Sequence, residues 1–118
     1  MRKENIIQEK SFAFAVRIVK LYQHIAKREK EYVLSKQLLR SGTSIGANVE
    51  ESIGGSSKKD FKAKLKISYK EARETMFWLK LLRETDYISV TEFKSVSEDC
   101  DEILRLLYTI IKNTKLNN

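Results

Sequence analysis

The hydrophobic residues of this 118-residue chain recur at intervals of three and four positions in four segments, a spacing typical of amphipathic helices. The segments cover roughly residues 7–25, 32–53, 58–84 and 89–111. Helices of about 22 to 27 residues are roughly 33–40 Å long. Short connections force neighbouring helices to run in opposite directions. The pattern therefore predicts an all-α fold, an antiparallel up-down-up-down four-helix bundle, as a single domain over residues 1–118.

Local signals mark the ends of these segments. Gly54-Gly55 closes the second segment. Ser57 with Asp60 is a capping-box-like start for the third, and Ser89 with Glu92 is a capping box for the fourth. The chain has no proline and only four glycines, which favours long uninterrupted helices over a turn-rich sheet. The polar tail from residue 113 to 118 is expected to fray.

The second segment has helical spacing but a composition that disfavours a helix, because glycine, serine, threonine and asparagine all lower helix propensity. A helix of small residues is kept when close packing offsets that cost. We therefore expect Gly46 and Ala47 to lie where another helix approaches closely. The apolar line of this segment comprises Leu34, Leu38, Ser41, Ile45, Val49 and Ile53.

A polar line with the same spacing runs along the second segment. A buried arginine has to be paired, so Arg40 is expected to meet either Glu51 of a neighbouring subunit or an acid on an adjacent helix. The line then either fixes the register of an assembly or forms a pocket for a ligand or RNA. Its members are Gln37, Arg40, Ser44, Asn48 and Glu51.

The third segment is apolar on two sides. Its main stripe includes Leu65, Ala72 and Leu79, and a second stripe lies roughly 120–180° away. A helix apolar on two sides touches two partners, so the second stripe predicts an oligomer interface. The alternative is one wide core face. The predicted interface residues are Ala63, Ile67, Trp78 and Leu81.

Charge is unevenly distributed in this basic protein, whose formal net charge is +7. Residues 58–73 include seven basic and two acidic residues, a net charge of +5, whereas residues 86–102 include six acids and one lysine, a net charge of −5. A basic helix face beside aromatic residues, here Tyr69 and Phe77 at its edge, can follow a phosphate backbone. The alternatives are a solvated face or a contact with the acidic fourth segment of another subunit. The candidate nucleic-acid-binding residues are Lys58, Lys59, Lys62, Lys66, Lys70 and Arg73.

Other candidate chemistry is weak. Lys10, Arg17 and His24 either extend the basic surface or face solvent. The turn before Lys58 has free N–H groups that can hold a phosphate, but it lacks P-loop spacing and capping explains it as well. A single histidine and a single cysteine, Cys100, disfavour a metal centre or a Cys–His pair. We expect no enzymatic activity, no cofactor and no metal. The lone cysteine and the lack of an apolar leader or membrane-spanning run predict a cytoplasmic protein.

The second segment also carries a recognisable motif. Gln37-Leu38-Leu39-Arg40-Ser41, Ser44-Ile45 and Asn48-Val49-Glu50-Glu51 resemble the signature of a bacterial four-helix-bundle family whose founding members are encoded in intervening sequences of 23S ribosomal RNA genes. Residues 61–82 fit as well, so the resemblance covers nearly the whole chain. It implies a homo-oligomer, often a pentamer, and no established enzymatic activity. A related accessory protein of diversity-generating retroelements is a basic pentamer that binds nucleic acid and a reverse transcriptase.

Two functions follow from these observations. The first is a non-enzymatic nucleic-acid-associated protein that binds RNA through the basic face of the third segment. The second is a protein–protein accessory scaffold that engages a partner enzyme, such as a reverse transcriptase, and uses its charges for assembly.

Overall fold

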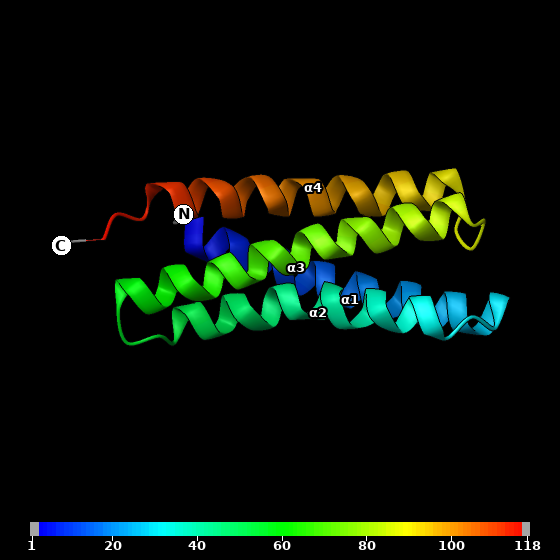
Figure 1. Ribbon diagram of the computed structural model, residues 1–118, viewed down its shortest axis with the longest axis horizontal. Coiled ribbons are helices and arrows are strands. Elements are labelled where there is room, and N and C mark those ends of the chain that lie inside the picture. The colour runs from blue at the N-terminus through cyan, green and yellow to red at the C-terminus, as the bar shows by residue number, and fades with distance from the viewer. Residues whose placement is uncertain (1–2, 117–118) are drawn as a thin grey trace.

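The structure, a computed structural model, describes residues 3–116. In this range the chain forms four helices, α1 (Lys3–Glu29), α2 (Val33–Ile53), α3 (Lys58–Glu84) and α4 (Val90–Asn113), and no strand. Figure 1 shows the chain running back and forth along one long axis, with α3 between α2 and α4, and α1 behind. The predicted all-helical, four-helix architecture is confirmed.

The helix ends follow local chemistry. The Ser57 side chain accepts from Asp60 N at 3.0 Å, and Ser89 and Glu92 form a complete capping box at the start of α4. One cap was not predicted. The Glu31 carboxylate accepts from the backbone N–H groups of Val33, Leu34 and Ser35 at 2.8–3.0 Å, and so satisfies donors that a helix start leaves unpaired.

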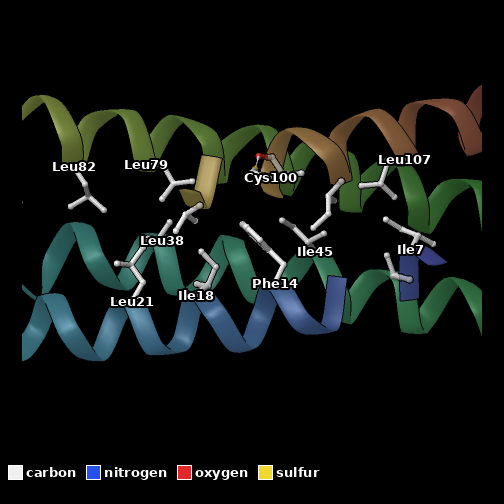
Figure 2. Packing of buried hydrophobic residues seen from close by; sticks show 14 of the residues in the cluster. Ile7, Phe14, Ile18, Leu21, Leu38, Ile45, Leu79, Leu82, Cys100 and Leu107 are labelled. Atoms are coloured by element: carbon white, nitrogen blue, oxygen red, sulfur yellow. Dashed lines mark hydrogen bonds between the residues drawn. The ribbon is translucent and has the colours of Figure 1, made fainter. Parts of the chain in front are cut away.

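The core lies between the helices and consists mainly of aliphatic side chains, with Phe14 and Cys100 among them, as Figure 2 shows. The apolar line of the first segment lies entirely inside it, from Ile7 to Ile25. The line of the second segment drifts outward, because Leu34 is only partly buried and Ile53 is 43% exposed. A straight helix has 3.6 residues per turn, so a long series of threes and fours rotates away from a fixed face.

Two glycines of α2 allow α1 to approach closely. A Cβ at Gly42 would lie 2.8 Å from Ile18 Cγ2, and a Cβ at Gly46 would lie 3.2 Å from the backbone oxygen of Ser11. The close approach predicted at Gly46 is therefore present, and Gly42 is tighter still. The prediction for Ala47 is wrong, because this residue is exposed. It lies one position further around the helix, about 100° away from Gly46.

Small polar residues fill the contact between α2 and α3, the most closely packed pair of helices. The Ser68 hydroxyl donates to the backbone oxygen of Ile45 at 2.8 Å, and the Thr75 hydroxyl contacts Ser41 Oγ at 3.0 Å. All three hydroxyl-bearing residues are fully buried. Their hydrogen bonds offset the cost of burying polar atoms, so short side chains bring the helices together without leaving unpaired groups.

Candidate nucleic-acid interface

The acidic residues of α4 lie against basic residues of α1. Lys10 Nζ lies 3.1 Å from Glu102, Arg17 donates to Asp99 at 2.6 Å, and Arg28 donates to Glu92 at 3.2 Å. The basic line of α1 is therefore engaged with acids of its own chain. It does not extend the basic surface of α3, which was one of the two interpretations of its pattern.

The same pairs affect the predicted contact between the acidic α4 and the lysines of another subunit. Glu92, Asp99 and Glu102 already have basic partners within the chain. The pKa of Glu92 is lowered: partial burial raises it, but backbone hydrogen bonding at Ser89 and the Arg28 guanidinium outweigh that effect. Because these acids are already paired within the subunit, a contact with lysines of another subunit would have to replace existing ion pairs.

The six candidate nucleic-acid-binding residues of α3 are five lysines and Arg73, and they contrast with the paired cations of α1. Most of the six residues are exposed, and only Lys62 is partly buried, with its Nζ donating to the backbone oxygen of Thr114 at 3.1 Å. Among residues 6–116, whose side chains the structure describes, none of the six takes part in an ion pair. Lys64, on another side of the helix, is bound to Glu51 at 3.0 Å. One face of α3 therefore presents a group of neighbouring cations that are available for a polyanion.

A cleft of about 360 Å³ opens between this face and α4. Its apolar part is formed by Tyr69, Tyr108 and Ile111, and three lysines surround it. The two tyrosine rings lie 6.4 Å apart, centroid to centroid, at an interplanar angle of 48°, and Tyr108 is 57% exposed. The lining has no acidic residue. Its lysines are Lys66, Lys70 and Lys112.

A second hollow of about 330 Å³ continues along α3 beside Arg73 and Lys80. Phe77 borders it and is 57% exposed. The sequence pattern placed Tyr69 and Phe77 at the edge of the basic face, and the structure keeps them there. It missed Tyr108 and Lys112, which α4 contributes. The available signal was an aromatic residue off the apolar line of the fourth segment.

The polar line of α2 lies on a different side of the bundle, along the seam with α3. Gln37, Arg40 and Glu51 are exposed, and Ser44 and Asn48 are partly buried. Within this line the Ser44 hydroxyl donates to the backbone oxygen of Arg40 at 2.6 Å, and Asn48 Nδ2 donates to that of Ser44 at 2.9 Å. The line is therefore a surface feature of the single subunit.

Arg40 is half exposed, so it is not the buried arginine that the pattern suggested. It donates to Glu71 at 3.2 Å and to Glu74 at 2.7 Å, both on α3, which is one of the two pairings predicted for it. Glu74 also accepts from the Trp78 indole N–H at 3.2 Å. These hydrogen bonds, that of Arg40 first, lower the pKa of Glu74. The network fixes the orientation of the Trp78 ring.

The predicted interface residues lie on α3 outside the single-chain core. Ala63 is exposed, Ile67 is 44% exposed, and Trp78 and Leu81 are partly buried. Through Arg40, Glu74 and Trp78 they adjoin the polar line of α2. The two predictions therefore describe one surface, which we call the α2–α3 seam.

A second apolar patch was not predicted. Phe12 is 68% exposed, and Val16 and Val19 are 39% and 36% exposed. These residues follow one another along α1 at intervals of three and four. Phe12 borders a hollow of about 240 Å³ whose floor includes Gly46 and Ala47. The signal in the sequence was a second apolar line beside the core line of α1.

The remaining chemistry is structural. Cys100 is fully buried, and burial raises the pKa of its thiol to about 12. His24 is half exposed and lies beside Arg28 and Glu92. In the described range, no three His, Cys, Asp or Glu side chains are grouped so as to hold a metal ion, and no helix is long and apolar enough to cross a membrane.

Comparison with known proteins identifies a protein family and similar solved structures. The model of a family described as 23S rRNA-intervening sequence protein matches residues 3–109. The chain is also similar to a crystal structure from Bacteroides thetaiotaomicron, described as a protein of unknown function from the S23 ribosomal protein family. The two chains are 50% identical, with a TM-score of 0.93, over 95% of this chain and 100% of the other. No curated protein matches.

Proposed function

The chain belongs to the 23S rRNA-intervening sequence protein family, and from that premise we propose that it is a non-enzymatic, homo-oligomeric RNA-binding protein of the cytoplasm. The observation that carries the proposal is the separation of charge. Three acids of α4, Glu92, Asp99 and Glu102, are paired with α1, whereas the six candidate residues of α3 take part in no ion pair among residues 6–116. Residues 58–73, which include all six, have a net charge of +5.

The geometry of that face suits a phosphate backbone. Lys62, Lys66 and Lys70 follow one another at intervals of four, about 6 Å apart along the helix axis. Flexible lysine side chains contact phosphates as point charges and carry little sequence information. Binding is therefore expected to be largely independent of sequence and strongly weakened by salt.

The test is a charge reversal of these three lysines. Lys62→Glu, Lys66→Glu and Lys70→Glu together should abolish RNA binding measured by fluorescence anisotropy, or lower the logarithmic salt slope by about 2 if three contacts to a single strand are lost. Circular dichroism should show unchanged helicity.

The matched control carries the same change of charge elsewhere. Lys20, Lys27 and Lys36 are exposed residues of α1 and α2, away from the α3 face. Their joint reversal to Glu should reduce affinity much less. If the two triple variants lose affinity equally, net charge rather than the α3 face drives binding and the proposed site is wrong.

We further propose that the subunits form a closed ring, most simply a pentamer as the family resemblance implies. A ring joins two different surfaces head to tail. The subunit offers two such apolar surfaces, Ile67 with Trp78 on the α2–α3 seam and Phe12 with Val16 on α1. Light scattering should give about five times the chain mass of 13.8 kDa.

Two single variants test the ring. Ile67→Glu and Phe12→Glu each place a charge on one of the two surfaces, and each should release monomers that remain helical. If only one of them changes the measured mass, the other surface does not take part. If neither does, the assembly uses different contacts.

The second candidate function is an accessory scaffold for a partner enzyme, such as a reverse transcriptase. The observation in its favour is the partly buried Trp78, whose indole is oriented by Glu74 and Arg40, since such an anchor is typical of protein interfaces. If the lysine triple variant loses its oligomeric state rather than RNA affinity, this function is favoured.

A further inference from the structure

Resting on the proposed RNA-binding function, we propose that the cleft between α3 and α4 is a base-binding site for single-stranded RNA, with Tyr108 as the residue on which a base stacks. The proposal assigns a class of nucleic acid to the basic face. It depends on the shape and lining of the cleft as well as on its charge.

The cleft between α3 and α4 has an apolar floor and basic surroundings. The floor consists of Tyr69, Tyr108 and Ile111, and Lys66, Lys70 and Lys112 surround it. A nucleotide has the same division, with a flat apolar base and an anionic phosphate. Lysine side chains line an apolar surface with their methylene stems and keep the charged end in water, so the ammonium groups of these lysines can reach a phosphate outside the cleft.

The exposure and the tilt of the Tyr108 ring also favour a bound base. It is 57% exposed, although aromatic rings on a helix usually bury much of their surface. Its ring is tilted by 48° against the Tyr69 ring instead of packing flat on it, so Tyr69 does not cover the Tyr108 ring face to face. The cleft volume of about 360 Å³ is within the range of small-ligand sites.

Single-stranded and duplex RNA offer different groups to such a cleft. Bases in a duplex are stacked on one another, and an A-form helix presents phosphates and 2′-hydroxyls to a protein. Lysines alone would serve such a partner, and an aromatic cleft would stay empty. Stacking on an aromatic side chain needs a base that is free to leave its neighbours.

An acidic amphipathic peptide is the competing occupant of the cleft. A peptide helix is best held by an extended apolar groove with anchors at successive turns. Here the hollow that continues along α3 is bordered by Arg73 and Lys80 as well as Phe77, and in the other direction the lysines continue towards Lys59. Single-stranded RNA has one negative charge and one flat base per nucleotide. It therefore fits apolar hollows beside a row of lysines better than a peptide helix does.

The experiment compares Tyr108→Ala with the full chain on a 15-nucleotide single-stranded RNA and on a duplex of the same sequence. Stacking of one base is worth a factor of roughly five to 150 in affinity. We expect that loss for the single strand and no change for the duplex. Tyr108→Phe should bind like the parent, and Tyr108→Leu, which keeps the apolar floor, should bind like Tyr108→Ala.

Tyr32→Ala is the matched control, since Tyr32 is 47% exposed at the connection between α1 and α2. It should leave both affinities unchanged. In a second readout, RNA containing 4-thiouridine should cross-link on irradiation to peptides carrying Tyr69 or Tyr108, identified by mass spectrometry. Cross-links confined to other helices would overturn the site.

The outcomes distinguish this inference from the function on which it rests. If neither RNA binds, the RNA-binding function fails, and the base-binding site fails with it. If both RNAs bind and Tyr108→Ala matches Tyr32→Ala, the function stands and the stacking site is wrong. If RNA does not bind while poly-glutamate binds in a manner that requires Tyr108, the cleft is a peptide site and the inference is overturned.

Discussion

The hydroxyl of Thr75 on α3 lies 3.0 Å from the hydroxyl of Ser41 on α2, and both residues are fully buried. Thr75 also reaches the backbone oxygen of Glu71 at 2.8 Å. The Ser41 hydroxyl has only a long contact of 3.4 Å, to the backbone oxygen of Leu38, as an alternative. Each helix thus supplies a partner for the other at their closest contact.

Thr75→Val should therefore lower the free energy of unfolding by more than the small change in side-chain shape suggests. It leaves the Ser41 hydroxyl without its main partner in the core, at a cost of about 1–3 kcal/mol of unfolding free energy. Adding Ser41→Ala removes the stranded hydroxyl and should recover part of the loss. Urea denaturation of the two single variants and the double variant measures this coupling. Strict additivity of their effects would show that the two hydroxyls do not interact.

Gly46→Leu should destabilise the bundle by about 1–3 kcal/mol, because the new side chain meets the backbone of Ser11, which cannot turn away. The control is Ala47→Leu, the same final residue one position along, on an exposed part of the helix. Thermal and urea denaturation should separate the two variants clearly. Equal stability would contradict the close approach of α1 at Gly46.

Gly42→Ala should also be destabilising, although alanine is the better helix former by about 1 kcal/mol. The added methyl would meet the Ile18 side chain at 2.8–2.9 Å. Ile18→Ala in the same chain removes the opposing atoms, so the double variant should be more stable than the two separate losses predict. A double-mutant cycle in urea measures this interaction.

Glu31 should make the stability of α2 depend on pH. Partial burial raises the pKa of its carboxyl, but hydrogen bonds from the backbone of α2 outweigh this, so the folded-state pKa is lowered. A lowered pKa gives stability that is present above the unfolded-state pKa and is lost as the pH falls through the folded value. Glu31→Ala should cost about 0.5–2 kcal/mol at neutral pH, and this difference should shrink in acid. A constant difference between pH 7 and pH 3 would contradict the charged cap.

Cys100 should be inert to thiol reagents in the folded protein. Its thiol pKa of about 12 keeps it protonated at pH 8, and burial blocks access. Labelling with Ellman's reagent should become fast only in denaturing urea. Fast labelling of the folded protein would show that α3 and α4 separate readily around this residue.

Sequence periodicity predicted the fold well because its signals are local. The capping box of Ser89 and Glu92 and the core line from Ile7 to Ile25 depend on neighbours within a few turns of one helix. Glu31 was missed because capping patterns look for a short polar residue at the cap, whereas here a longer acid one position earlier reaches the same N–H groups.

The candidate site was predicted only on the α3 side. The lysines follow from the spacing along one helix, but the position of Tyr108 opposite Tyr69 depends on how α4 is aligned along α3, which no local pattern specifies. The same holds for the pairing of Arg17 with Asp99, 82 positions apart. Neither the pairing of the α1 cations with α4 nor the aromatic cleft was therefore predicted from the sequence.

The pairing of the α4 acids with α1 also affects how a subunit moves before it touches anything. Neutralised charges on one flank and unpaired cations on another give the molecule an electric dipole directed across the bundle. In the field of a polyanion this dipole produces a torque, which turns α3 towards the partner during diffusion and raises the association rate. That rate should fall with salt over distances set by the Debye length, about 8 Å at physiological ionic strength. The intramolecular ion pairs, which touch no partner, would thus help to choose the face that arrives first.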